Sequence, residues 1–420
     1  MKKMFTLLAI AIVFFNCSKD VDDTENGLQD FTVTLNVDAN HRFSRFQEST
    51  FAFLSDENGT ILACGELHLG ETTILSFSDS PSMHYDLSYM RYDNIVDLGI
   101  KTYTLVTFTN IEQGTYDIGP TPLLENSHDE IFINLDNTGY PFEVTSGVTG
   151  AGGGGPENGG YYNFRSNLVS SPTSDFYASF KSPNDQFERF FWQRDIPEGS
   201  VFNIDYNSLP AITNTVNTQI PSNDYSYFSV YGLKMDDENN IHHSIALGNF
   251  AGGNPSLSTS TPPNVFDDFL FNVHFKNDNT GYSKQLRTTT IPEEINTPTL
   301  NFTVNNQSPR NFSMTTTGEA TLYDVTYRAG NIDETLFFSY SVYGEVLPEV
   351  TFSKEILRQN IQEAYPILVD FQILPLGDVN LTYYSQTNSY LDILKYKIQG
   401  DYYEIPATNG VVDRMSKQFD

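Results

Sequence analysis

Cys17 is the residue whose position in this chain points most directly to chemistry. It follows Met4–Phe15, an apolar run interrupted only by Thr6, and the basic residues Lys2 and Lys3 precede that run. A cysteine sulfur is a nucleophile that can carry a covalently attached lipid. Spanning a bilayer takes about 20 apolar residues, so this run is too short to be a permanent anchor. Its length and flanks match the apolar core of a secretory signal.

The residues Phe14-Phe15-Asn16-Cys17 resemble a bacterial lipobox and are similar to the versions found in Bacteroidota lipoproteins. They depart from the commonest lipobox, which has Leu three positions before the cysteine and a small residue just before it. The resemblance implies that residues 1–16 are a signal peptide and that lipidated Cys17 begins the mature chain. The alternative is a plain secretory signal followed by an incidental cysteine.

Residues 17–28 form an acidic tether in which Lys19 is followed by Asp20, Asp22 and Asp23. A lysine followed by acids just after the lipidated cysteine resembles the surface-export signal of the same lipoprotein group. The resemblance implies a lipid-anchored protein of the outer membrane that faces the cell exterior. A solvated acidic spacer is the alternative interpretation of these residues.

The charge balance restricts the partners that this chain can have. The 23 basic and 53 acidic residues give a formal net charge of −30. Nucleic-acid binding depends on Lys and Arg that neutralise phosphates, so we expect no nucleic-acid partner. Anionic lipid surfaces are repelled as well, which leaves the lipid on Cys17 as the expected contact with the membrane.

The sequence offers few candidates for catalysis or for metal binding. With Cys17 lipidated, the other cysteine, Cys64, would have no partner, and we expect it to be a small buried residue on a strand. The motifs G-x-S-x-G, H-E-x-x-H and the phosphate-binding loop are absent from the sequence. Abundant acids leave a carboxylate pair for glycoside hydrolysis open, but no spacing selects two of them. We therefore predict no catalytic residue, no cofactor and no metal site.

Alternating apolar and polar residues predict a mainly β protein. In Phe31–Val37 the apolar side chains occupy every second position, which places them on one face of a strand. The stretch 51–67 reads as strand, Asn58-Gly59 turn and strand, because Asn-Gly supplies the positive φ angles of a tight hairpin. Further alternating segments follow at spacings typical of β-sandwiches.

Composition divides the chain into tandem domains. Residues 147–160 hold mostly Gly, which has no side chain to bury, so they are interpreted as an inter-domain linker or a long loop. The sequence Asp-Asn-Thr-Gly-Tyr occurs in both Asn134–Phe142 and Lys276–Lys284, which suggests a duplicated domain; the alternative is that hairpin turns reuse Asn and Gly. The predicted domains are β-sandwich-like residues 29–146, a second β domain at 161–290, and a C-terminal domain at 291–420.

The C-terminal domain is expected to be β-rich or α+β with one short helix, at 353–365. Ser353 can cap that helix, Leu357 and Ile361 lie on one stripe, and Pro366 ends it. The later segment Leu391–Ile398 is interpreted as a strand.

The first domain also resembles transthyretin-like and carboxypeptidase-regulatory-like sandwiches. The resemblance rests on a D-x-N-G-x-x-L turn at Asp56–Leu62 and on the segment Gly114–Gly119. It implies a β-sandwich fold for about the first hundred residues after the tether.

Together these features predict a lipid-anchored surface protein with a non-catalytic binding, adhesion or structural role, whose ligand would be a protein or a polysaccharide. The alternatives are a glycan-capture component of an uptake system and a surface hydrolase. Trp192, the single tryptophan, lies in a segment that is apolar on both faces and is therefore expected in a core. The 25 tyrosines keep sugar binding open, because aromatic rings stack on sugars.

Overall fold

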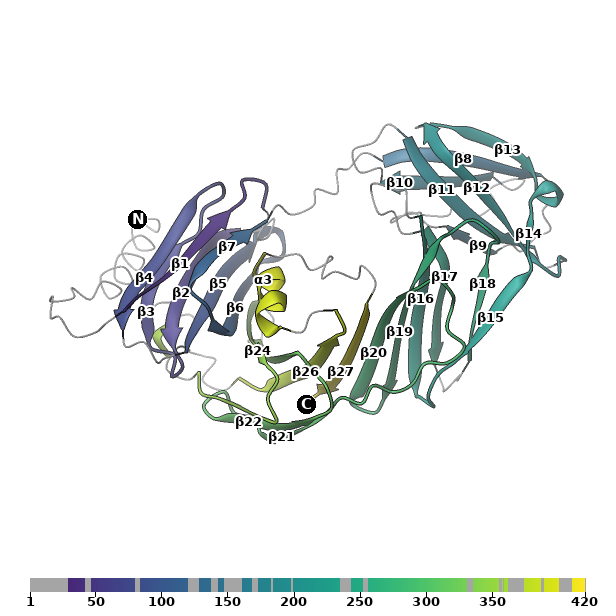
Figure 1. The fold of residues 1–420 in the computed structure, drawn as a ribbon. Coiled ribbons are helices and arrows are strands. Elements are labelled where there is room, and N and C mark those ends of the chain that lie inside the picture. Colours follow the sequence, from purple (N-terminus) through teal and green to yellow (C-terminus); the bar gives the residue numbers. More distant parts are fainter. Residues whose placement is uncertain are drawn as a thin grey trace. The chain divides into compact units, whose positions relative to one another are not determined.

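The computed structural model shows a multi-domain protein made mainly of β-strands (Figure 1). The structure describes residues 29–41, 47–79, 84–119, 128–136, 143–146, 161–167, 173–182, 184–197, 199–234, 243–251, 256–330, 335–354, 357, 359–361, 374–386, 389–399 and 410–419. Among these residues, no helix has the length and apolar character needed to cross a membrane.

The chain divides into two compact units that are discontinuous in sequence. Unit 1 comprises residues 1–121, 299–405 and 414–420, and unit 2 comprises residues 122–298 and 406–413. Unit 1 thus combines segments from the first and last parts of the chain, and unit 2 is formed largely by its middle.

The first part of unit 1 is a seven-stranded β-sandwich, here called sandwich 1. One sheet has the order β4-β1-β7, in which β1 is antiparallel to β4 and parallel to β7, and the other has the order β3-β2-β5-β6. The strands are β1 (Gln29–Val37), β2 (Gln47–Asp56), β3 (Ile61–Glu66), β4 (Thr72–Asp79), β5 (Tyr85–Ile95), β6 (Ile100–Ile111) and β7 (Gly114–Ile118). A short 3₁₀ helix, η1 (Val96–Leu98), lies between β5 and β6.

The same strand order recurs in unit 2 as sandwich 3. Its first strand, β15, pairs antiparallel with β18 and forms a parallel bridge from Gln219 to Glu294, and its second sheet has the order β17-β16-β19-β20. The strands are β15 (Asn214–Gln219), β16 (Tyr225–Leu233), β17 (His243–Ala251), β18 (Ser256–Thr261), β19 (Asp268–Asn277) and β20 (Thr280–Thr288).

Sandwich 2, also in unit 2, has seven strands in a related order: among the described residues it has no equivalent of β3, and β14 is added at the opposite edge of that sheet. Its first strand, β8, pairs antiparallel with β10 and parallel with β13, and the other sheet has the order β14-β12-β11-β9. The strands are β8 (His128–Asp136), β9 (Glu143–Ser146), β10 (Tyr161–Asn167), β11 (Thr173–Lys181), β12 (Glu188–Pro197), β13 (Val201–Asp205) and β14 (Ala211–Ile212), with the 3₁₀ helix η2 (Tyr206–Ser208) after β13.

Sandwich 4 completes unit 1 with a related order. Its strands follow the sheet order β27-β26-β23-β24, and β22 pairs antiparallel with β25 and with β21 in the second sheet. The elements are β21 (Asn301–Asn306), β22 (Phe312–Thr317), β23 (Leu322–Gly330), β24 (Leu336–Glu345), β25 (Glu349–Phe352), β26 (Leu376–Tyr384), α3 (Tyr390–Gln399) and β27 (Val411–Gln418). One strand order therefore recurs, with variations, four times along the chain.

Sequence alternation explains how the sandwiches close. In β1 the side chains of Val33, Leu35 and Val37 are buried, whereas the residues between them are half-buried. In sandwich 2 a core forms between the two sheets, where Leu135 of β8 and Phe180 of β11 are almost fully buried. Burying such side chains contributes about 1.5–3 kcal/mol each, which makes these layers the main source of stability.

Trp192 lies where the sequence pattern predicted it. It packs edge-on against Phe266, with ring centroids 5.5 Å apart, at the border of the large core of unit 2. Phe190 belongs to that same core, whereas Phe191 packs against the separate core of sandwich 2. Both faces of β12 therefore contact apolar side chains.

The observed units differ from the predicted domains. Residues 291–420 do not form a separate domain, because β24 pairs in parallel with β6, from Leu336 opposite Lys101 to Tyr343 opposite Phe108. This pairing joins two segments that are far apart in the chain, so no local sequence pattern predicts it.

The Gly-rich segment 147–160 lies outside the described residues, but it does not separate the two units. It connects β9 to β10, which both belong to unit 2, and β10 pairs with β8 on the other side of the segment. The shared Asp-Asn-Thr-Gly-Tyr motif follows β8 in one place and joins β19 to β20 in the other, so the two copies occupy different positions in the strand order.

Two local predictions had different outcomes. In the predicted helix 353–365, Leu357 and residues 359–361 are helical. Leu357 and Ile361 are buried one turn apart, as the predicted stripe requires. Residues 353–354 are not helical, and the rest of this range lies outside the described residues. The strand prediction for Leu391–Ile398 is wrong, because these residues lie in the helix α3. The buried residues Tyr390, Leu394 and Ile398 are spaced by four, which is a helical period.

Candidate functional site

The residues that the sequence predicted for anchoring and export lie outside the described residues. They are Cys17, Lys19, Asp20, Asp22 and Asp23. Their roles therefore stay predictions.

Cys64 requires a correction, because the structure has it in a disulfide bond. We expected Cys64 to have no partner on the assumption that Cys17 is lipidated. The chain has only these two cysteines, so a thioether to lipid and a disulfide to Cys64 are competing fates of the Cys17 sulfur. The chemical state of Cys17 thus decides whether the N-terminal segment is a lipoprotein signal or a plain secretory signal followed by an incidental cysteine.

One hollow in unit 1 lies where sandwich 1 meets sandwich 4. It has a volume of about 520 Å³, within the range of small-molecule pockets. Sandwich 1 contributes the β2–β3 turn and the ends of β5 and β6, and sandwich 4 contributes β22 and the segment from β24 to the residues after β25. The lining includes Glu57, Asn58, His84, Asp86, Asn110, Asn311, Tyr323, Glu345, Glu349 and Lys354.

A buried ion pair forms the inner wall of this pocket. Lys354 Nζ contacts Asp86 Oδ2 directly, and the side chains of Lys354 and Asp86 are only 3% and 4% exposed. Nζ also donates a hydrogen bond of 2.8 Å to the carbonyl oxygen of Glu57, and the backbone N–H of Asn110 donates to Asp86 Oδ1 at 3.1 Å. Both charged groups are therefore hydrogen-bonded within the protein.

Local backbone geometry positions each member of the pair. Asp86 lies near the start of β5, and its neighbour across the hairpin, Asn110, has a positive φ of 62° that turns its N–H toward the carboxylate. Lys354 follows β25, where its own N–H donates to the carbonyl oxygen of Pro309 at 3.0 Å. Gly59, at the tip of the β2–β3 turn, approaches the backbone of Leu357 so closely that no larger residue fits.

Burial is the main influence on the acidity of Asp86. Removal from water raises the pKa of its carboxyl group, while the charge of Lys354 and the hydrogen bonds from Lys354 and Asn110 oppose that rise. A buried pair of this kind is strongly coupled, because removing either partner leaves the other charge without compensation.

Further buried polar groups continue from the pocket into the junction between the sandwiches. Tyr390 of α3 donates a hydrogen bond of 2.6 Å to the carbonyl oxygen of Thr109. Deeper in the sheet, Thr107 Oγ1 contacts Ser88 Oγ at 2.8 Å and donates to the hydroxyl of Tyr340 at 3.4 Å. These contacts tie β5 and β6 of sandwich 1 to sandwich 4 in addition to the β6–β24 pairing.

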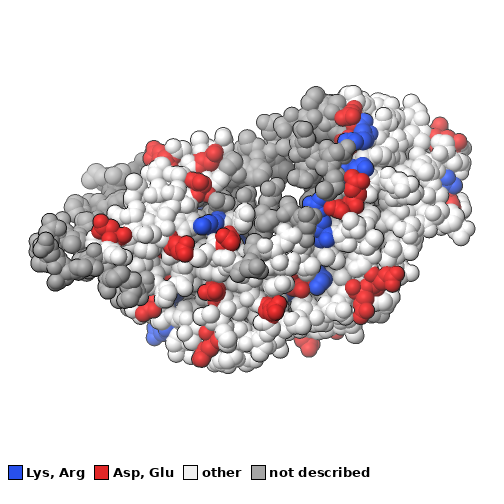
Figure 2. All heavy atoms as spheres, viewed as in Figure 1, with Lys and Arg blue, Asp and Glu red and all other residues white. Residues whose placement is uncertain are grey.

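The arrangement supports amine and carboxyl chemistry better than metal chemistry. Within the described ranges, no group of three or more His, Cys, Asp or Glu side chains could hold a metal ion. The pocket instead presents one lysine in contact with one aspartate, surrounded by the exposed carboxylates Glu57, Glu345 and Glu349. Figure 2 shows acidic side chains in scattered groups over the visible surface, in keeping with the charge of the chain.

A second surface feature lies on the sheet of sandwich 3. Tyr225 and Tyr227 are 39% and 36% exposed, whereas Ser226 and Phe228 between and beyond them are buried. The two tyrosines therefore share the outer face of β16, which is an interior strand of its sheet. Tyr227 lies opposite His274 of β19, so polar side chains flank the rings.

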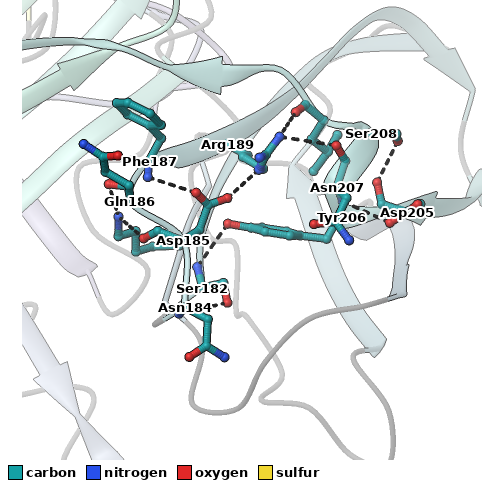
Figure 3. A network of polar contacts seen from close by, with 12 residues as sticks. Ser182, Asn184, Asp185, Gln186, Phe187, Arg189, Asp205, Tyr206, Asn207 and Ser208 are labelled. Atoms are coloured by element: carbon teal, nitrogen blue, oxygen red, sulfur yellow. Dashed lines mark hydrogen bonds and ion pairs between the residues drawn. The ribbon is translucent and has the colours of Figure 1, made fainter.

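A third polar cluster, in sandwich 2, has a structural role (Figure 3). Arg189 donates to Asp185 Oδ2 at 2.6 Å and to the carbonyl oxygen of Leu209 at 2.7 Å, and its guanidinium lies over the ring of Tyr206. The hydrogen bond from Arg189 lowers the pKa of Asp185. The Tyr206 hydroxyl accepts a hydrogen bond from the backbone N–H of Ser182. The cluster fastens the β11–β12 turn to η2.

Neither the pocket nor the tyrosine pair was predicted as a site. Asp86 and Lys354 are 268 residues apart, so no sequence pattern links them. The tyrosines carried a usable signal, since "YSYFSV" at the start of β16 alternates aromatic and small polar residues before becoming continuously buried.

Comparison with known proteins identifies no family. No protein-family model matches the chain, and a search of curated proteins finds no match. Among solved structures, trypsin-activated alpha-2-macroglobulin from Escherichia coli is 7% identical with a TM-score of 0.15; the match covers 87% of this chain and 23% of that protein.

Two other solved structures are similarly distant. The Bacillus anthracis TIE protein is 8% identical with a TM-score of 0.14, covering 80% of this chain and 73% of that one. A fimbrial assembly protein from Parabacteroides distasonis is 6% identical with a TM-score of 0.10, covering 74% and 98%. These similarities are too low to bear on fold or function.

Proposed function

We propose that this chain is a lipid-anchored, surface-exposed outer-membrane protein with a non-catalytic binding, adhesion or structural role. The observation that carries the proposal is the order of the N-terminal segment, in which two lysines and an apolar run precede Cys17 and an acidic tether. Each buried methylene of an attached acyl chain contributes about 0.8 kcal/mol, so several chains hold a soluble body firmly at a bilayer.

The fold is compatible with that role. Each of the two units contains sandwiches of related strand order, and the sequence holds none of the catalytic motifs named above. Adhesion and display require reach and stability rather than a deep active site. The tether of residues 17–28 would separate this body from the membrane.

Cell fractionation tests the proposal directly. The unaltered chain should sediment with outer membranes, and C17A should be released or remain uncleaved. On intact cells, added protease should degrade the unaltered chain. Replacing Lys19, Asp20, Asp22 and Asp23 by Ala should protect it without removing the lipid. Full protection of the unaltered chain would place it on the periplasmic side and contradict surface display.

Glycan capture is the second candidate, and the exposed pair Tyr225 and Tyr227 favours it. Side chains two residues apart on a strand are separated by about 6.5–7 Å, so both rings can contact one extended sugar chain. The neighbouring His274 and Asn272 could supply hydrogen bonds to hydroxyl groups.

Affinity electrophoresis in gels containing soluble polysaccharides tests this second candidate. Retardation by one polysaccharide should be lost in the Y225A/Y227A double variant. F337A, which removes an equally exposed ring from sandwich 4, is the matched control and should be retarded like the unaltered chain. No retardation by any polysaccharide, or equal loss in both variants, would reject the tyrosine face as a glycan site.

A further inference from the structure

We propose that Lys354 and Asp86 become joined by an intramolecular isopeptide bond, an amide between the two side chains that covalently links sandwich 4 to sandwich 1. This modification goes beyond the proposed surface role and does not depend on it.

The geometry brings the reacting atoms together in a dry environment. Nζ of Lys354 is in direct contact with Oδ2 of Asp86, and both side chains are almost completely buried. Holding two reactants in a productive arrangement corresponds to effective concentrations of about 10⁵–10⁸ M. The pair therefore has the proximity that amide formation between free side chains lacks.

The neighbouring groups suit the reaction as well. The carbonyl oxygen of Glu57 accepts one N–H of Lys354, which orients the amine while its remaining face points at the carboxyl group. The backbone N–H of Asn110 donates to Oδ1 of Asp86. That donor would stabilise the negative charge that develops on Oδ1 when nitrogen attacks the carboxyl carbon, as in an oxyanion hole.

The steps balance without an added reagent. A proton passes from the Lys354 ammonium to the Asp86 carboxylate, giving a neutral amine and a neutral acid. The nitrogen lone pair then attacks the carboxyl carbon Cγ and forms the new C–N bond. The bond from Cγ to Oδ2 breaks, and Oδ2 leaves as water with one proton from the acid and one from the amine. Oδ1 remains as the amide oxygen and keeps its hydrogen bond from Asn110.

Burial favours the neutral form of Asp86, on which the first step depends. Two isolated charges in a low-dielectric interior are costly, and burial raises the pKa of Asp86. The nearby charge of Asp56 acts in the same direction. Amide formation removes both charges permanently.

Other lysine–aspartate pairs of the chain lack this environment and serve as internal controls. Lys284 and Asp413 lie 2.7 Å apart but remain 19% and 16% exposed. Lys234 and Asp267 are 3.3 Å apart, with Asp267 44% exposed. Water reaches these side chains, so they should stay unlinked.

Peptide mass mapping of the reduced full-length chain tests the proposal. The unaltered protein should yield a branched peptide that contains Lys354 and Asp86 with the mass of its two parts less one water. Peptides containing Lys284 and Asp413 should appear separately. In K354R, which keeps the positive charge but cannot form this bond, the branched peptide should be absent. Separate, full-mass peptides for Lys354 and Asp86 in the unaltered protein would overturn the proposal.

A second experiment detects the same isopeptide bond by gel electrophoresis. A protease recognition sequence placed within residues 147–160 allows the folded chain to be cut between the two linked positions. On a denaturing, reducing gel the cut protein should still migrate as one species, whereas cut K354R should separate into two. Separation of the cut protein that retains Lys354 would likewise overturn the bond.

Discussion

At the scale of single residues, the junction between sandwiches 1 and 4 depends on positions where only one residue type fits. Gly59 has a φ of +88°, and a Cβ there would lie 2.7 Å from the backbone nitrogen of Leu357. Gly344 faces the ring of Tyr323 so closely that a Cβ would overlap it. The sequence predicted the turn at Asn58-Gly59, but it could not show that a helix from the far end of the chain packs on that turn.

Replacing Gly59 by Ala should therefore destabilise unit 1 more than an ordinary turn glycine would. G99A is the matched control, because Gly99 also has a positive φ, +65°, but nothing lies within 4 Å of its Cβ position. We expect G99A to cost about 1 kcal/mol from backbone strain and G59A to cost about 2–4 kcal/mol because overpacking adds to that strain. Urea denaturation measures both, and equal costs would show that Leu357 does not pack on this turn.

At the scale of elements, α3 shows why sequence periodicity misled the prediction. Leu391 and Ile393 alternate with charged residues as in a strand, yet Tyr390, Leu394 and Ile398 are also spaced by four. Tertiary contacts decide between these patterns, since α3 packs near β7 and Tyr390 bonds to Thr109. Short apolar segments are ambiguous for this reason.

Neighbouring substitutions in α3 test the helical assignment. L394A should lower the free energy of unfolding by about 2–5 kcal/mol, because Leu394 is 1% exposed and its removal leaves a cavity. K395A, on the exposed face of the same helix, should change it by no more than about 0.5 kcal/mol. I393A should also be costly, because Ile393 is fully buried beside Leu394 on the packed side of the helix. If Leu391–Ile398 were instead a strand, residues 393 and 394 would point to opposite faces, and one of the two substitutions would cost little.

The polar cluster around Arg189, which connects the β11–β12 turn to η2, predicts that the stability of the fold depends on pH. The pKa of Asp185 is lowered in the folded chain, so its stabilising contribution is fully present above the pKa of about 3.9 of the unfolded chain. That contribution is lost as the pH falls through the lower, folded value. D185N should therefore be less stable than the unaltered chain at pH 7, and the difference should shrink in acid. A difference independent of pH would contradict the role of the Asp185 charge.

At the scale of the whole molecule, repeated strand order was only partly visible in the sequence. Alternation and turn residues predicted a mainly β protein, and a duplication was suggested. The shared motif, however, follows strands at different positions in the order. The bounds of the sandwiches depend on pairings such as β1 with β4 and β1 with β7, between which other strands intervene in the sequence. The candidate pocket was not predictable at all, because its walls come from two widely separated segments, one around Glu57–Asn110 and the other around Asn311–Lys354.

The strands that pair on either side of the Gly-rich segment 147–160 lead to a prediction about cleavage within it. If K354R carrying a protease site within residues 147–160 is cut under native conditions, its two pieces should stay associated, since β8 pairs with β10 and β6 pairs with β24 across the cut. Size-exclusion chromatography should show one species of unchanged volume. Two separate folded pieces would instead support the tandem domains that the sequence suggested.

The central claim is that this β protein is held at a membrane by lipid on Cys17, and the mass of its mature N-terminal peptide tests that claim most directly. Protein extracted from membranes and digested without reduction should give a peptide that begins at Cys17 and carries a diacylglycerol and an N-acyl chain. An N-terminus at another residue, or a Cys17 peptide joined by a disulfide to the peptide that contains Cys64, would contradict it.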